Sequence, residues 1–178
     1  MGKTVRQRHL VVRALSRRAT SGHLTFGNLR FSCALGRGGQ KALKREGDGA
    51  TPVGRLAVRE AYYRGDRLPR PHTALPIKPV RRSSGWCDRV GDRNYNRAVR
   101  LPYAGSAERM WREDGLYDLT VVLGYNDRPR IQGRGSAIFM HVAREGLRPT
   151  EGCIALRRRD LVRLLSALAR GAVLRIGL

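Results

Sequence analysis

The stretch from Ala137 to Leu156 decides how this chain folds, and it reads Ala-Ile-Phe-Met-His-Val-Ala-Arg-Glu-Gly-Leu-Arg-Pro-Thr-Glu-Gly-Cys-Ile-Ala-Leu. Its first five residues predict a buried strand that ends in His141. Twelve residues later, Cys153 follows a glycine and precedes a second short apolar run. The eleven residues between them form a loop long enough to bring the two side chains together without strain.

A cysteine beside a histidine suits nucleophilic catalysis, because an imidazole can take the thiol proton or hold the thiolate as an ion pair. Gly152 would let a substrate carbonyl approach and would leave backbone N–H groups available as an oxyanion hole. Each residue alone also has an ordinary interpretation, since a lone cysteine usually packs as a small hydrophobe. His141 and Cys153 together, with Thr150 before the glycine, favour catalysis.

The flanking sequence predicts a mainly β fold with one amphipathic helix. Leucines at 161, 164, 165 and 168 have helical spacing, so we expect an amphipathic helix that ends at Gly171, with Asp160 as its first-turn acid or cap. Gly27-Asn28 suits a tight hairpin turn. The predicted strands cover residues 9–15, 24–26, 29–33, 55–63, 117–123, 137–141 and 172–176.

Two stretches lack clear periodicity. Residues 36–52 are predicted to be a glycine-rich loop region, and residues 64–115 an irregular insertion punctuated by prolines. Four aromatic residues in the insertion suggest that it is ordered and forms the wall of a binding site. The length favours a single domain over residues 1–178.

With these motifs, the chain resembles the L,D-transpeptidase catalytic domain family (YkuD-like). The family signature is a strand-end histidine followed by Ser/Thr-x-Gly-Cys-Ile/Val-x-Leu/Met, matched here by His141 and residues 150–156. Thr51-Pro-Val-Gly54 and the Asp160-Leu161 helix start also match, so the resemblance runs from about residue 24 to 176. It implies a mixed β-sheet sandwich with one C-terminal helix after the cysteine.

Two departures indicate a divergent branch. The family often has glycine directly after the histidine and arginine two residues after the cysteine, where this chain has Val142 and Ala155. Arg157 or its neighbours could replace that arginine. We assign substrate binding to four residues: Arg157, Tyr125, Asn126 and Trp86.

The resemblance implies acyl transfer on peptidoglycan stem peptides without a metal or organic cofactor. Cys153 would form a thioester at the L-centre of diaminopimelate, His141 would act as base and then acid, and Thr150 would orient the imidazole. Cys153 and Gly152 would supply the oxyanion donors. Transfer to an amine would give a 3–3 crosslink or a protein attachment. The alternative is hydrolysis of the same bond by an L,D-carboxypeptidase or amidase.

Charge alone leaves the partner open. The 178 residues include 36 Lys plus Arg against 14 Asp plus Glu, a formal net charge of +22 that predicts attraction to nucleic acid, acidic lipid headgroups or a wall polymer. A nucleic-acid-binding protein is the remote alternative, because no zinc finger, RNP-like strand or recognition helix is visible. We therefore expect no nucleic acid partner and take a monomer as the default.

The three cysteines and the N-terminus bear on the compartment. An odd number of cysteines without a C-x-x-C motif argues against a disulfide framework and a structural zinc site. Cys33 is expected to be packed in a strand, and Cys87 is the other thiol that could lie near the site. We see neither a secretory signal nor a transmembrane segment, yet the implied substrate favours the cell envelope or periplasm.

Overall fold

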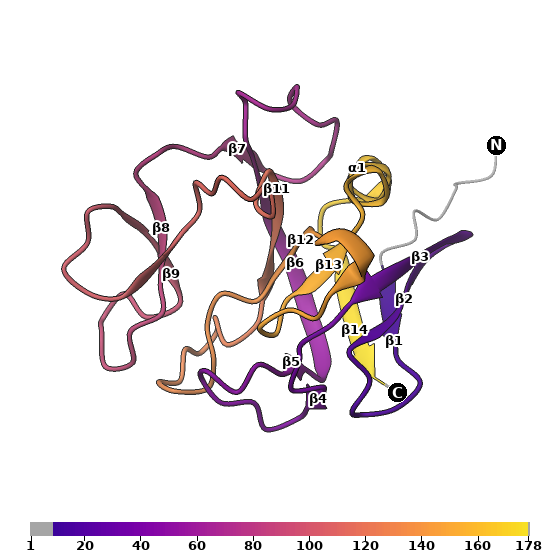
Figure 1. The fold of residues 1–178 in the computed structure, drawn as a ribbon, viewed down its shortest axis with the longest axis horizontal. Coiled ribbons are helices and arrows are strands. Elements are labelled where there is room, and N and C mark those ends of the chain that lie inside the picture. The colour runs from indigo at the N-terminus through magenta and orange to yellow at the C-terminus, as the bar shows by residue number, and fades with distance from the viewer. Residues whose placement is uncertain (1–8, 178) are drawn as a thin grey trace.

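The computed structural model describes residues 9–177, and its largest element is a nine-stranded mixed sheet (Figure 1). The strand order is β11-β12-β13-β3-β2-β1-β14-β6-β7. In chain order, these strands are β1 (His9–Arg13), β2 (Ser21–Phe26), β3 (Leu29–Ala34), β6 (Gly54–Tyr63), β7 (Ile77–Pro79), β11 (Leu119–Gly124), β12 (Phe139–Val142), β13 (Ile154–Leu156) and β14 (Val173–Gly177). The predicted strands are therefore confirmed, with small changes at their ends.

The sheet closes on itself, because β6 pairs with β11 as well as with β14. Alternate residues of the strands turn inward, as the exposed-buried pattern of β1 shows, and they meet in one large apolar core. Closure of this kind pairs these strands on both sides, except β7, which pairs with β6 alone. The pairs β1–β14, β12–β13 and β6–β7 are parallel, so the sheet is mixed as predicted.

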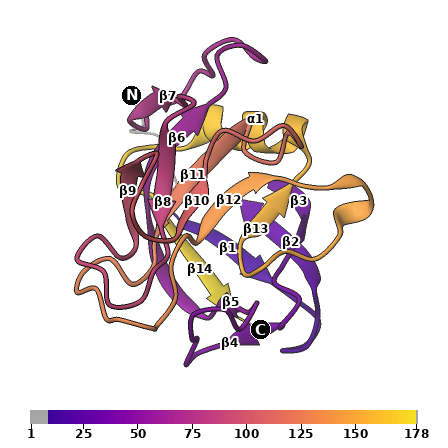
Figure 2. The same ribbon diagram turned by 60° about the vertical axis from the view of Figure 1, so that its left-hand side comes forward.

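Helix α1 (Arg158–Ala167) follows β13 and covers part of the core (Figure 2). Its buried face consists of Leu161, Leu164 and Leu165, the leucines whose spacing predicted it. Asp160 lies in the first turn but does not cap the helix, because the N-cap residue is Arg157 and no side chain bonds there. Leu168 is the C-cap, so the helix ends before Gly171, which adopts a positive φ of 76° in the following turn.

The insertion at residues 64–115 is more regular than predicted. Besides β7, it contains β8 (Ser84–Cys87), β9 (Arg97–Arg100) and β10 (Ala107–Arg109), which form a separate three-stranded sheet in the order β10-β8-β9. Strands of three or four residues are too short to show a period of two, which is why the sequence did not reveal them. Figure 1 shows β8 and β9 on the side of the molecule opposite β1–β3.

A second apolar cluster joins this small sheet to the main one. It includes Trp86 from β8, Phe139 from β12, Tyr117 and Cys153. The predicted loop region 36–52 contains only the two-residue strands β4 (Gln40–Lys41) and β5 (Thr51–Pro52), and a 3-10 turn, η1 (Glu145–Leu147), lies between β12 and β13. Among residues 9–177, no helix is long and apolar enough to cross a membrane.

Candidate active site

Strands β12 and β13 place His141 and Cys153 on one face of the sheet. They run parallel, with His141 opposite Ala155. Cys153 lies two residues before Ala155, and side chains two residues apart in extended backbone point to the same side. Both residues line one cavity of about 400 Å³. The structure thus brings together the two residues that the sequence motif singled out.

The Cys153 thiol is held between two backbone groups of the neighbouring strand segment. Its Sγ donates to the carbonyl of Ala137 at 3.2 Å and accepts from the N–H of Phe139 at 3.4 Å. Burial raises the pKa of the thiol to about 12, and the carboxylate of Glu108 adds to that rise, while the Phe139 N–H and Lys44 oppose it. The Cys153 side chain is therefore a protonated thiol.

The His141 imidazole is also neutral in this structure. Its Nδ1 lies 2.9 Å from the carbonyl oxygen of Val142, and because a carbonyl can only accept, Nδ1 carries the proton and Nε2 is the basic nitrogen. Burial lowers its pKa to about 4. A neutral thiol beside a neutral imidazole does not form a thiolate–imidazolium pair in advance. This arrangement favours transfer of the thiol proton to His141 only when the sulfur attacks a substrate.

Thr150 shapes the cysteine loop, and among residues 9–177 it makes no hydrogen bond with the imidazole, so its orienting role stays a prediction. Its hydroxyl donates to the carbonyl of Cys153 at 2.6 Å and accepts from the N–H of Gly152 at 3.2 Å, while its own carbonyl accepts from the N–H of Arg37. The hydrogen-bond partner that the structure shows for the imidazole is the adjacent backbone carbonyl of Val142.

The backbone conformation directly before Cys153 requires a glycine at position 152. It has a φ of +127°, and a Cβ at this position would lie 2.8 Å from the carbonyl oxygen of Ala50. Any other residue would therefore be strained and would push the 36–52 loop away from the cysteine loop.

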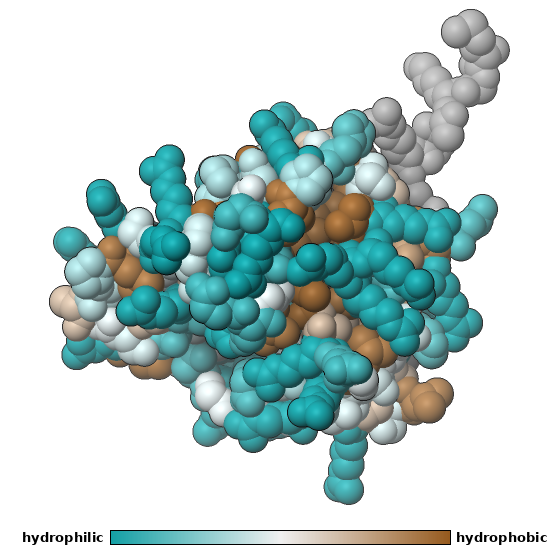
Figure 3. Space-filling view, turned by 45° about the horizontal axis from the view of Figure 1, so that its top comes forward, coloured by the Kyte–Doolittle hydropathy of each residue, from teal (hydrophilic) through white to brown (hydrophobic). Residues whose placement is uncertain are grey.

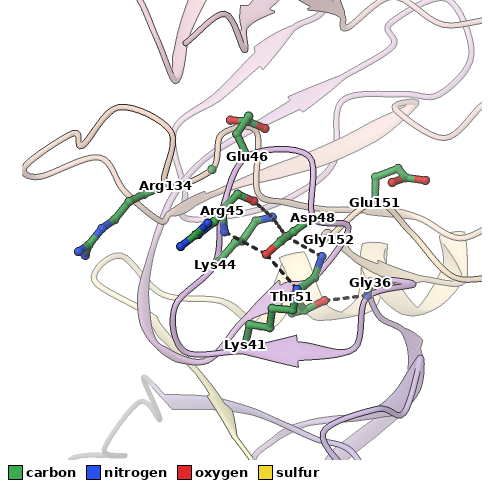
Figure 4. Close-up of polar contacts among 12 residues, drawn as sticks. Gly36, Lys41, Lys44, Arg45, Glu46, Asp48, Thr51, Arg134, Glu151 and Gly152 are labelled. Carbon is green, nitrogen blue, oxygen red and sulfur yellow. Dashed lines mark hydrogen bonds and ion pairs between the residues drawn. The ribbon is translucent and has the colours of Figure 1, made fainter. Parts of the chain in front are cut away.

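The 36–52 loop forms one wall of the cavity and is organised around Asp48 (Figure 4). The Asp48 carboxylate accepts from Lys44 Nζ at 2.7 Å and from the N–H groups of Arg45 and Ala50 at 3.0 Å each. Partial burial opposes ionisation, but these hydrogen bonds outweigh it and lower the pKa of Asp48 to about 2. The buried Lys44 and the half-buried Glu46 both line the cavity, and Glu46 accepts hydrogen bonds from the hydroxyls of Tyr95 and Ser136.

The four residues assigned to substrate binding lie outside the cavity lining, so the cavity does not support that assignment and it stays a prediction. Trp86 is buried, donates from Nε1 to Asn96 Oδ1 at 3.0 Å and packs edge-on against Phe139. Tyr125 donates to the carbonyl of Arg134, and Asn126 bonds to the backbone of Ile131 and Gly135, so both hold a loop. Arg157 is the exposed N-cap of α1.

Three other arginines line the cavity and were missed: Arg112, Arg144 and Arg148. Arg144 and Arg148 are exposed residues of the loop between His141 and Thr150. Their position between the two motif residues could have predicted that they lie at the cavity. They supply positive charge at a cavity where Ala155, also in the lining, lacks the family arginine.

The opposite charge in the cavity comes mainly from Glu46, Asp88 and Glu108. Glu108 accepts a hydrogen bond from the hydroxyl of Tyr117, whose ring lies 5.3 Å from that of His141. Burial raises the pKa of Glu108. Asp88 Oδ1 is buried and has no hydrogen-bond partner among the described residues.

The two remaining thiols do not share the cavity. Cys33 is buried in the main core, where burial raises its pKa to about 12, and Cys87 is buried in β8 away from the lining. No group of His, Cys, Asp and Glu among residues 9–177 is suited to hold a metal ion.

A closed β-rich fold whose cavity pairs a thiol with an imidazole defines a candidate cysteine-dependent enzyme. Residues 9–176 match the family model of the L,D-transpeptidase catalytic domain (YkuD), so the chain belongs to this family of acyltransferase-type enzymes. Among solved structures, L,D-transpeptidase 1 of Mycobacterium tuberculosis is similar at 12% identity with a TM-score of 0.40. That match covers 94% of this chain and 61% of the other, and comparison with curated proteins gave no match.

Proposed function

We propose that this protein is a peptidoglycan L,D-transpeptidase in which Cys153 is the nucleophile. The observation that carries the proposal is the cavity shared by Cys153 and His141, two residues that also match the family motif. The substrate is the tetrapeptide stem of peptidoglycan, attacked at the carbonyl of the L-centre of diaminopimelate, and the compartment is the cell envelope.

In the first half-reaction, Cys153 Sγ attacks this carbonyl while His141 Nε2 takes the thiol proton. The backbone N–H of Cys153 stabilises the oxyanion; that of Gly152 already donates to Thr150. When the tetrahedral intermediate collapses, the imidazolium gives its proton to the departing D-Ala amine, and the stem remains as a thioester. In the second half-reaction, an acceptor amine attacks the thioester and loses a proton to His141. The tetrahedral intermediate then expels the Cys153 thiolate, which takes that proton back from the imidazolium and regenerates the thiol.

The basic wall of the cavity supports recognition of an anionic stem peptide. Arg144 and Arg148 are exposed at the cavity, and the guanidinium of Arg112 lies above the ring of Tyr117 at 5.2 Å. Arginine binds carboxylates through paired N–H donors, so these side chains take over the role of the arginine that Ala155 replaces.

The acidic wall favours transfer to an amine over hydrolysis. In a chain with 36 basic and 14 acidic residues, Glu46, Asp88 and Glu108 all line this one cavity. Such carboxylates attract the protonated acceptor amine, which gives one proton to solvent before it attacks, whereas neutral water gains little from them. Hydrolysis by a carboxypeptidase or amidase remains the alternative, with the same steps up to the thioester.

Glu108→Gln is expected to lower the yield of cross-linked product about tenfold, because one charged partner of the acceptor amine is lost. Release of D-Ala is expected to change less than about threefold, because the first half-reaction does not need the acceptor. Glu113→Gln, at an exposed carboxylate outside the cavity lining, is the matched control. A parallel loss of both products in Glu108→Gln would contradict this role.

The proposed function is tested by mass spectrometry of purified tetrapeptide muropeptides after incubation with the protein. We expect free D-Ala and a 3–3 cross-linked dimer. Free D-Ala with tripeptide alone would identify a carboxypeptidase, and unchanged muropeptides would contradict the proposal.

A further inference from the structure

The acidic residues of this chain are unevenly distributed along the sequence. Residues 1–45 contain 11 Lys plus Arg and no Asp or Glu, and residues 161–178 contain three Arg and again no acid. These two segments therefore contribute 14 positive charges to the net charge of +22.

The fold places strands from the two acid-free segments side by side. Strands β3, β2, β1 and β14 are consecutive neighbours in the sheet, and both ribbon views show them side by side (Figures 1 and 2). The pairing register places five residues in one row across the sheet: Arg30, Thr25, Val11, Arg175 and Arg55. With strands about 4.8 Å apart, the row spans roughly 19 Å and has arginine at both ends.

The arginines of this surface are exposed and carry uncompensated charge. Arg13, Arg30, Arg55 and Arg175 all face solvent, and within residues 9–177 none lies within ion-pair distance of a carboxylate. Elsewhere in the fold, carboxylates commonly pair with arginine, as Asp118 does with Arg67. Hydrophilic side chains also dominate the face shown in Figure 3, so an abundance of polar residues does not distinguish this surface. What distinguishes it is that these four arginines have no carboxylate partner among the described residues.

The loop after β1 adds an apolar tip to the surface. Leu15 is fully exposed, at 103% of its reference area, and it is followed by the exposed Arg17 and Arg18. A leucine flanked by arginines is unfavourable in water but suits the boundary between headgroups and acyl chains. The aromatic residues of the neighbouring strands, Phe26 and Phe31, are buried, so this surface lacks the stacking platforms typical of proteins that bind single-stranded nucleic acid.

We propose that this basic face, formed by Arg13, Arg17, Arg18, Arg30, Arg55, Arg175 and Leu15, docks on a bilayer that contains anionic phospholipids. The arginines bind the headgroup phosphates and Leu15 enters the interface. None of the cavity-lining residues belongs to β1, β2 or β14, so the docked protein keeps its cavity open to stem peptides. The inference stands independently of the reaction catalysed.

The test is cosedimentation of the full chain with vesicles of phosphatidylcholine mixed with phosphatidylglycerol, and with pure phosphatidylcholine vesicles. We expect binding to the mixed vesicles only, weakening as salt screens the charges. The triple variant Arg30→Gln/Arg55→Gln/Arg175→Gln should bind about 100-fold more weakly, because each arginine near an anionic membrane surface strengthens binding about fivefold. Leu15→Ser should weaken the binding that persists at high salt.

The control variant Arg70→Gln/Arg81→Gln/Arg128→Gln removes the same net charge from exposed arginines outside this face. It should retain nearly full binding, and both triple variants should release D-Ala from soluble muropeptides as the unmodified protein does. Equal weakening in the two triple variants would overturn the proposal by assigning binding to net charge alone. Binding to double-stranded DNA but not to mixed vesicles would also overturn it.

Discussion

Cys153→Ala is expected to abolish release of D-Ala from tetrapeptide muropeptides. Alanine keeps the small apolar volume of the buried position but cannot form the thioester, so the loss should be at least about 10⁴-fold. The reaction is followed by measuring free D-Ala over time. Binding of the stem peptide should persist, because the arginines around the cavity are unchanged.

Cys33→Ala is the matched control for this variant. Cys33 is also fully buried and also has a pKa raised to about 12 by burial, but it lies in the main core and not in the cavity lining. Cys33→Ala should release D-Ala at nearly the unmodified rate. Activity in Cys153→Ala comparable to that in Cys33→Ala would show that the nucleophile lies elsewhere.

His141→Gln is expected to slow D-Ala release by about 10²- to 10⁴-fold, the usual contribution of a positioned general base. Glutamine fits the buried position but cannot take the proton of a thiol whose pKa is raised to about 12. His23→Gln, at an exposed histidine of β2, should leave the rate unchanged. A rate in His141→Gln within threefold of the unmodified enzyme would contradict a role in proton transfer.

The pH dependence of kcat/KM follows from the same pair. The imidazole can accept a proton only when neutral, and burial lowers its pKa to about 4. Activity should therefore be retained as the pH falls through 6.5, the ordinary pKa of histidine, and should decline only as the pH approaches about 4. A decline centred near pH 6.5 would indicate an imidazole that is exposed to water in the working enzyme.

The sequence predicted those parts of the fold in which local pattern and burial agree. Strand β12 lies in the interior, and its sequence is correspondingly mostly apolar. The inward face of α1 consists of three leucines whose helical spacing is visible in the sequence. His141 and Cys153 could be predicted to lie close together because both belong to one short sequence motif. The parallel pairing of β12 with β13 brings the two ends of that motif side by side.

The rest depends on contacts between residues far apart in the chain. Glu108 reaches the cavity from an insertion whose strands are too short to be recognised from hydrophobic periodicity. Glu46 reaches it from a loop that Asp48 holds through hydrogen bonds. Trp86 was assigned to substrate binding because aromatic residues among polar ones suggest a binding wall, yet its ring fills the space over Phe139. Only the tertiary packing distinguishes these two uses of an aromatic side chain.

The central claim is that Cys153 is the nucleophile of an acyl transfer, and the most direct test is the mass of the protein after incubation with a carbapenem. A strained β-lactam carbonyl acylates such a thiol, opening the ring without a leaving group, so the protein should gain one whole drug mass. Peptide mapping should place the adduct on Cys153, and Cys153→Ala should gain none. An adduct on Cys87, or no adduct on the unmodified protein, would contradict the claim.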